Sequence, residues 1–183
     1  MAKKVVFGIA GSISAFKAPL VLRALQAAGY DVWPVLTASG AQYVTPLVLR
    51  TLSGHDIPVG DFAATPDPGT FHHIALATGA AAMLVAPCSA NTLAQLAYGL
   101  CPSILAATAL ALPPGAPLLV APAMNANMFL HPATQHNLDT LRARGVHILA
   151  PDSGPLACGA EGPGRLPDPP AIVAALDALL QPH

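Results

Sequence analysis

Short apolar segments alternate with helix-like segments along almost the whole chain, and this alternation restricts the fold more than any other feature. Residues 5–10 are apolar and rich in β-branched side chains, residues 15–28 have helical spacing and end at Gly29, and residues 31–36 are again strand-like. A strand, a glycine-containing turn, a helix and a second strand form the βαβ unit of parallel sheets. Because Pro34 cannot donate a backbone hydrogen bond, we expect its strand to be an edge strand or an irregular one.

The alternation continues to the end of the chain. We expect further strands over residues 81–86, 117–121 and 146–150, and further helices over residues 41–53, 91–99, 103–111, 132–145 and 170–180. Segments rich in Gly, Pro or Asp are expected to be loops, at residues 56–69 and 154–165. The pattern predicts one α/β domain over residues 1–183, a doubly wound, Rossmann-like (flavodoxin-like) fold with a mostly parallel sheet.

One long part of the chain carries no formal charge. From residue 68 to residue 138 there is no Asp, Glu, Lys or Arg. Protein surfaces normally mix charges of both signs, so this part should be covered on most sides. A central sheet covered by the rest of the chain would explain it, and so would a subunit interface, because obligate interfaces are depleted of charge. We favour the interface and predict a homo-oligomer.

Several classes of protein are excluded. The net charge of −1 and the lack of a basic run argue against nucleic-acid binding. The apolar stretch over residues 104–123 is interrupted by two prolines and a glycine, so neither part reaches the roughly 20 residues of a membrane span. The apolar run near the N-terminus is too short for a signal peptide, so we expect a cytoplasmic protein. Three widely spaced cysteines, Cys88, Cys101 and Cys158, predict neither a disulfide framework nor a metal site.

Polar and small residues follow the expected strands, where doubly wound sheets bind ligands. Gly11-Ser12-Ile13-Ser14 follows the first strand and precedes a helix, so its N–H groups and hydroxyls could hold a phosphate, although a simple strand–helix turn would look the same. Hydroxyls and amides recur at residues 37–40, 87–92 and 122–128, without cations. This composition suits a monophosphate on a flat apolar ring system better than a triphosphate with magnesium.

Five motifs in a fixed order carry a family resemblance. They are GSISAFK, the pair His73-Ile74, PCSANT, PAMNANMF, and LACG followed by GPGR. The set resembles the homo-oligomeric flavin-containing cysteine decarboxylases over roughly residues 4 to 168, with Cys88 where that family commonly has Ala and Phe129 where it has Trp. The resemblance implies a carboxy-lyase that binds FMN between the subunits of a trimer, or of a dodecamer built from trimers.

The resemblance also implies a cofactor site and a chemistry. The residues that it assigns to FMN are Gly11, Ser12, Ile13, Thr37, Ser89, Ala90, Asn91, Thr92 and Ala123. A cysteine carboxylate has no electron sink for the carbanion that loss of carbon dioxide would leave. Oxidation of the Cβ–S bond to a thioaldehyde provides that sink, and decarboxylation then gives an enethiolate. The flavin supplies the two-electron oxidation, while the protein orients the substrate and transfers protons.

Three residues are the catalytic candidates. His73, expected in a loop, is the candidate base because imidazole titrates near neutral pH; its neighbour His72 matches no motif position. Asn125 is expected to orient the substrate carboxylate through its amide donors, whereas Asn127 is expected to stabilise the turn. Cys158 is implied to assist reduction of the enethiol.

Two further residues complete the predicted substrate site, which also includes Asn125 and Cys158. Met128 is expected to pack against flavin, substrate or core. Arg165 is expected either to pair with an acidic group of the substrate or to cap its own loop.

The resemblance leaves the substrate open between two branches. One branch acts on 4′-phosphopantothenoylcysteine in coenzyme A biosynthesis, and the other acts on a C-terminal cysteine of a ribosomally made peptide. Cys158 favours the first branch. The scarcity of cations, the absence of a ligase domain and the residues Ala75 and Thr78, where relatives commonly carry charge, favour the second. We expect a peptide substrate by a small margin, and a non-catalytic FMN-binding subunit is the remaining alternative.

Overall fold

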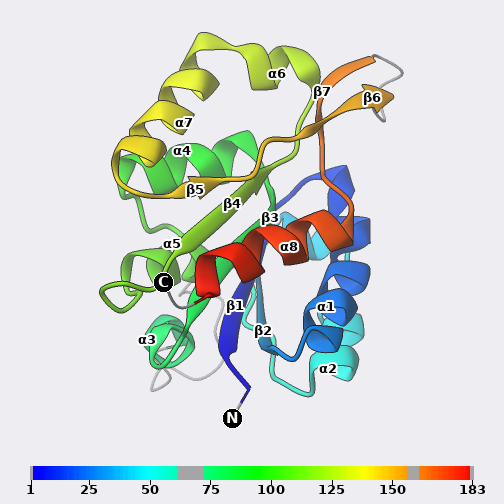
Figure 1. Cartoon of the computed structure of the whole chain (residues 1–183), viewed down its shortest axis with the longest axis vertical. Helices are drawn as coiled ribbons and strands as arrows, with labels where there is room; N and C mark the ends of the chain where they lie inside the picture. The colour runs from blue at the N-terminus through cyan, green and yellow to red at the C-terminus, as the bar shows by residue number, and fades with distance from the viewer. Residues whose placement is uncertain (1, 62–71, 156–160, 182–183) are drawn as a thin grey trace.

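The computed structural model describes residues 2–61, 72–155 and 161–181, and it is built around a five-stranded parallel sheet. The strands lie in the order β2-β1-β3-β4-β5, the flavodoxin-like order, with helices on both faces (Figure 1). Their bounds are β1 Lys4–Ile9, β2 Asp31–Leu36, β3 Ala82–Cys88, β4 Leu118–Pro122 and β5 His147–Ile148. The doubly wound prediction is confirmed. β2 is an edge strand, as Pro34 requires.

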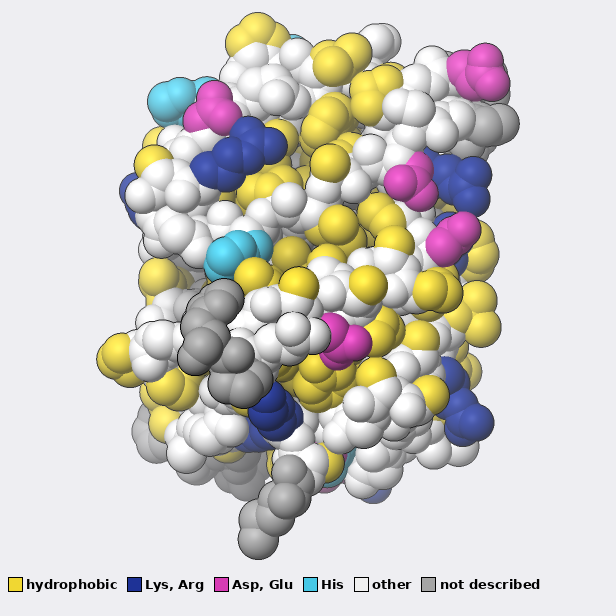
Figure 2. Space-filling model, in the orientation of Figure 1, with side chains coloured by type: hydrophobic (Ala, Val, Ile, Leu, Met, Phe, Trp, Pro, Cys, Tyr) yellow, Lys and Arg dark blue, Asp and Glu magenta, His cyan; other side chains and the backbone are white. Residues whose placement is uncertain are grey.

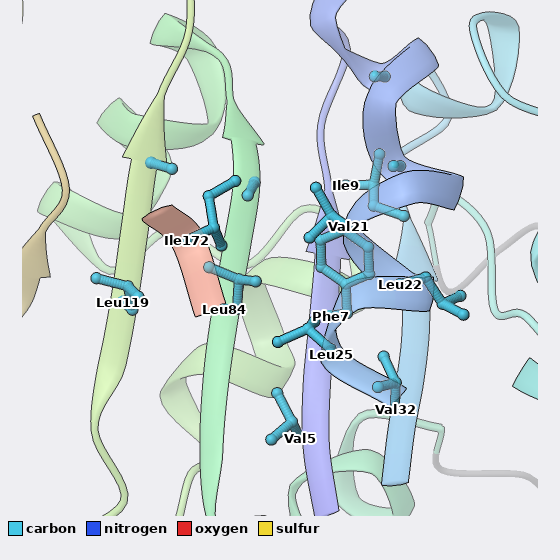
Figure 3. Close-up of a cluster of buried hydrophobic side chains, with 14 of the residues drawn as sticks. Val5, Phe7, Ile9, Val21, Leu22, Leu25, Val32, Leu84, Leu119 and Ile172 are labelled. Carbon is cyan, nitrogen blue, oxygen red and sulfur yellow. The ribbon is translucent and has the colours of Figure 1, made fainter. Parts of the chain in front are cut away.

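Two hydrophobic clusters cover the two faces of the sheet. On one face α1 (Ala18–Ala27), α2 (Pro46–Ser53) and α8 (Pro169–Leu180) pack on the strands. Figure 3 shows this cluster, in which Phe7 of β1 lies beside Val21 of α1. On the other face the strands are covered by α3 (His72–Ala77), α4 (Ala90–Tyr98), α5 (Ile104–Leu110) and α7 (Pro132–Ala143).

The interior strand β1 shows why both faces of the sheet are covered by helices. Val5 and Phe7 belong to the first cluster and Val6 to the second, and all three are fully buried. Side chains alternate between the faces of a strand, so a strand that is apolar at every position is buried on both sides. Gly8 leaves room for α5: a Cβ there would lie 2.9 Å from Cδ1 of Leu105.

Several elements differ from the expected ones. The helix expected over residues 15–28 begins as a 3₁₀ helix, η1 (Ile13–Lys17), and the helix expected from residue 41 begins only at Pro46. A short 3₁₀ turn, η2 (Gly40–Gln42), precedes it. The Thr45 Oγ1 accepts the N–H of Val48 at 3.4 Å, and a proline at the first helical position is favourable, so the helix start is set locally.

Four short elements were not among the expected helices and strands. The helix α3 contains His73, so the expectation of a loop there is wrong. The helix α6 (Ala126–Leu130) follows β4. The strands β6 (Asp152–Pro155) and β7 (Glu161–Arg165) pair antiparallel and include much of the expected glycine-rich loop. Each of these elements is too short to show a hydrophobic period in the sequence.

Candidate functional site

A cleft of about 570 Å³ lies at the carboxyl ends of β1, β3 and β4. This volume is within the range of small-molecule and cofactor pockets. The described residues that line it are Gly11, Ser12, Ile13, Ser14, Phe16, Lys17, Tyr43, Ser89, Ala90, Ala123, Met124, Asn125, Met128, Gly164 and Arg165. The cleft therefore lies where ligands of doubly wound sheets bind.

The turn after β1 forms one wall of the cleft. The Ser12 Oγ accepts the N–H of Ser14 at 3.4 Å and caps η1. Gly11 packs so closely on Ser39 that a Cβ at this position would collide with the Ser39 side chain. Ser39 also contacts Thr37: the Thr37 Oγ1 lies 3.1 Å from the Ser39 Oγ, within hydrogen-bond distance. Thr37 is buried and is not among the described lining residues, so its expected contact with FMN stays a prediction.

The start of α4 forms a second wall. The Ser89 Oγ accepts the N–H of Thr92 at 3.3 Å and donates to its Oγ1 at 3.2 Å. Ser89 and Ala90 line the cleft, whereas Asn91 is exposed outside it and Thr92 is buried beneath it. The N-terminus of α4 therefore directs its positive end toward the cleft, an arrangement that favours anions.

The segment after β4 contributes Ala123, Met124, Asn125 and Met128. The Asn125 Oδ1 accepts the N–H of Asn127 at 2.9 Å and caps α6, so the turn-stabilising role expected of Asn127 belongs to Asn125. This bond uses the acceptor of the Asn125 amide. The donors that a carboxylate requires are at the other end of the same group.

Two cations line the cleft: Arg165, which was expected in the substrate site, and Lys17, which was not. The Lys17 Nζ donates to Asp168 Oδ1 at 2.9 Å and to the carbonyl of Leu166 at 3.4 Å. The Arg165 Nη2 lies 3.7 Å from the same Asp168 oxygen. The hydrogen bond and charge of Lys17 lower the pKa of Asp168, with a smaller contribution from Arg165. No acidic side chain occurs among the described lining residues, so the cleft has positive character.

The predicted catalytic residues are not brought together within one chain. Asn125 lines the cleft, but His73 does not. The C-terminal end of α3 is hydrogen-bonded to Lys4, where β1 begins, and Figure 1 places this helix at the opposite end of the sheet from α6 and the β6–β7 hairpin. Cys158 lies outside the described residues. Cys88 is buried, and burial raises the pKa of its thiol.

Sequence reasoning missed several lining residues. Lys17 belongs to the GSISAFK motif, and the 3₁₀ turn of η1 brings it to the cleft. Tyr43 and Phe16 are exposed apolar side chains at its rim, with exposed fractions of 47% and 61%. Gly164 lines the cleft because it lies in β7 of the hairpin, and no periodic pattern in the sequence predicts that hairpin.

Other kinds of site have little support. The described part of the chain contains no group of three or more side chains suited to binding a metal ion. Among its helices, none has the length and apolar character needed to cross a membrane. Figure 2 shows charged side chains scattered over one face, with hydrophobic ones between them.

Comparisons with known proteins agree with this architecture. Residues 1–181 match the family model described as "Flavoprotein". The chain is 41% identical over 172 residues to the coenzyme A biosynthesis bifunctional protein CoaBC of Escherichia coli, covering 93% of this chain and 41% of that protein. It is also 39% identical over 180 residues to a probable phosphopantothenoylcysteine decarboxylase of Streptococcus mutans, covering 98% of this chain and all of that protein. The chain thus spans less than half the length of the bifunctional relative.

Two solved structures show the same fold at full length. One is a PPC decarboxylase mutant complexed with pantothenoylaminoethenethiol, with a TM-score of 0.85, 27% identity, and 97% and 98% of the two chains covered. The other is the FMN-dependent cysteine decarboxylase SpaF, with a TM-score of 0.79, 31% identity and 98% of each chain covered.

Proposed function

This chain belongs to the flavoprotein family, and on that premise we propose that it is an FMN-dependent decarboxylase of a cysteine carboxylate, with 4′-phosphopantothenoylcysteine as its substrate. The names of the relatives with about 40% identity support this substrate over a peptide. The small preference for a peptide that the sequence suggested depended on three features, and one of them was the scarcity of cations at the site. That argument fails because Lys17 and Arg165 line the cleft.

The single observation that carries the proposal is the charge of this cleft. Lys17 is held with its side chain only 16% exposed, and Arg165 lies on the other side of Asp168 with 43% exposed. Two cations share one carboxylate, so a net positive charge remains for a phosphate or carboxylate of the substrate. A peptide ending in Cys presents one carboxylate and no phosphate at this end, so it would use only part of this charge.

The described residues also fit FMN. Hydroxyls of Ser12, Ser14 and Ser89, together with the N-terminus of α4, can hold a phosphate monoester, and the apolar rim can cover a flat ring. When bound, FMN would take two electrons from the Cβ–S bond of the substrate and, with a small-molecule substrate, return them to the enethiol. The chain itself binds and orients the substrate and transfers protons. Because Asn125 lines the cleft, we expect its amide to hold the carboxylate that leaves as carbon dioxide.

His73 can serve this cleft only from a second copy of the chain. We therefore infer a homo-oligomer, in agreement with the uncharged segment over residues 68–138. Ile74, next to His73, exposes 49% of its surface, and Tyr98, Leu100 and Leu110 expose more than half of theirs. Large apolar side chains also occur on free surfaces. Several of them exposed in one uncharged segment, however, are typical of a subunit interface.

A complementation experiment tests the shared site. His73→Asn and Asn125→Asp are each expected to abolish turnover. Co-expressed, they should regain part of the activity, because some interfaces then combine an intact His73 with an intact Asn125. If both variants assemble normally but the co-expressed pair stays inactive, then His73 acts within its own chain or has no catalytic role.

The substrate is tested by mass spectrometry of two parallel incubations under air. One contains 4′-phosphopantothenoylcysteine, and the other contains short peptides ending in Cys. We expect loss of carbon dioxide alone from the first and no change in the second. Loss of carbon dioxide with two hydrogens from a peptide would instead identify a peptide-modifying enzyme. No reaction in either, with bound FMN established by its absorbance, would favour a non-catalytic subunit.

A further inference from the structure

Three side chains gather around the only tryptophan of the chain, at the ends of β1 and β2 opposite the cleft. The Trp33 Nε1 donates to Asp31 Oδ2 at 2.7 Å, and the His55 Nε2 lies 2.7 Å from the other oxygen of that carboxylate. The rings of Trp33 and His55 stack with centroids 3.9 Å apart. The Lys4 Nζ lies 4.4 Å from the centroid of the Trp33 ring. We call Lys4, Asp31, Trp33 and His55 the Trp33 cluster.

The strand pairing explains why these residues meet. Lys4 of β1 is in register with Asp31 of β2, and Asp31 and Trp33 are two residues apart, so their side chains project from the same face of the strand. That face is the one covered by α3, α4, α5 and α7. The cluster is therefore built into the sheet on the side where α3 packs.

Lys4 connects the cluster to α3. Its Nζ donates to the carbonyl of Ala75 at 2.8 Å and to the carbonyl of Thr78 at 2.9 Å, at the C-terminal end of the helix. The last carbonyls of a helix have no partners within the helix, and a cation there also interacts favourably with the helix dipole. The helix has only six residues, too few to be stable without tertiary contacts. Lys4 thus supplies two of the contacts that fix where α3 ends.

The same short helix carries His73, two residues before Ala75. We propose that Lys4, held in place by the Trp33 cluster, is a positioning residue that fixes α3 and thereby the direction in which His73 is presented. This inference rests on the proposed function, in which His73 is the base. A catalytic group misplaced by about 1 Å can lose about a hundredfold in rate, so small movements of α3 matter.

Lys4→Met is the direct test, with Lys3→Met as its matched control. The neighbouring Lys3 also donates to a helix carbonyl, that of Leu180 at 2.8 Å, but this carbonyl belongs to α8. In the FMN-loaded enzyme, Lys4→Met is expected to lower kcat about tenfold to a hundredfold with little change in KM, because no cleft residue changes. Lys3→Met should leave both constants unchanged.

Lys4→Arg should restore most of kcat, because a guanidinium can stack on Trp33 and donate to two carbonyls. Trp33 fluorescence and FMN absorbance show whether each variant retains the cluster and the cofactor. If Lys4→Met does not fold, failure of Lys4→Arg to support turnover in a folded, FMN-loaded protein would equally overturn the proposal. So would a wild-type kcat for Lys4→Met, or an equal loss for Lys3→Met.

The His73→Asn variant distinguishes between two hypotheses: that His73 is the base, and that Lys4 positions it. If it is inactive while Lys4→Met has full activity, His73 is the base but Lys4 does not position it. If His73→Asn turns over normally, the assignment of the base fails, and the positioning proposal fails with it.

Discussion

The backbone N–H of Met124 donates to the carbonyl of Gly164 at 3.0 Å and thereby joins the segment after β4 to the β6–β7 hairpin at the cleft. Gly164 has a φ of +134°, and a Cβ there would collide with the carbonyl oxygen of Met124. The contact needs glycine for two reasons, its backbone conformation and its lack of a side chain. Asn125 follows Met124 and Arg165 follows Gly164 in the chain, so the positions of both cleft residues depend on this contact.

Gly164→Ala is therefore expected to destabilise the protein more than an alanine at an unhindered glycine. Gly145 has a φ of +80° with nothing near its Cβ position, so Gly145→Ala should lower the free energy of unfolding by about 1 kcal/mol through backbone strain alone. Gly164→Ala should add about 1–3 kcal/mol for the collision. Chemical denaturation of both variants measures this difference in the free energy of unfolding. Equal losses would show that the hairpin can shift to accommodate the extra methyl group without destabilising the fold.

The sheet could be predicted from the sequence because each of its main strands is an uninterrupted apolar run between turn residues. β1 and β3 are buried on both faces, and such strands stand out against polar surroundings. The helix α6 and the β6–β7 hairpin could not be predicted, because five or fewer residues rich in Gly, Pro and Asn show no period. Their stability comes from tertiary contacts such as that between Met124 and Gly164.

The same distinction applies to the site. Gly11, Ser12 and Ser89 could be placed at the cleft because they directly follow strands whose ends meet at one edge. Arg165 also lines the cleft, but it was expected there only through the family resemblance, because its position depends on the β6–β7 hairpin. The distance between His73 and the cleft could not be predicted either, because the sequence pattern does not show how far the short helix α3 lies from the carboxyl ends of the strands. His73, Asn125 and Cys158 remain predicted catalytic residues.

Lys17→Gln tests the role of charge in the cleft. If Lys17 binds the phosphate of the substrate, the variant should lose about tenfold or more in kcat/KM with 4′-phosphopantothenoylcysteine and much less with the same compound lacking phosphate. Arg23→Gln is the control, since Arg23 is exposed on α1 and is not among the lining residues. Steady-state kinetics with both compounds give the comparison, and an equal loss with both would assign Lys17 a structural role through Asp168.

Asp31→Asn should lower stability in a pH-dependent way. Burial raises the pKa of Asp31, but hydrogen bonds from His55 and Trp33 and the charges of His55 and Lys4 outweigh it, so the pKa is lowered in the folded state. A carboxyl with a lowered pKa stabilises the fold above its unfolded pKa of about 3.9, and this contribution is lost as the pH falls through the folded value. The variant should therefore be less stable than the wild type at pH 7, and the difference should shrink at acidic pH.

Urea denaturation at neutral and acidic pH tests this expectation. Asp139→Asn is the control: it removes an exposed pair with Arg142 on α7, of a kind that contributes about 0–1 kcal/mol. A stability difference for Asp31→Asn that does not change with pH would mean that packing around Trp33, rather than the charge of Asp31, determines the effect.

Cys88 and Cys101 should differ sharply in reactivity. Cys88 is the last residue of β3 and is fully buried, and burial raises the pKa of its thiol, so little thiolate forms near neutral pH. Cys101 is exposed. With iodoacetamide, mass spectrometry of peptides from the native protein should find Cys101 alkylated and Cys88 unmodified, whereas both should react in denaturant. Alkylation of Cys88 at the rate of Cys101 in the native protein would mean that the end of β3 opens to solvent, and the wall of the cleft that begins at Ser89 would then not be rigid.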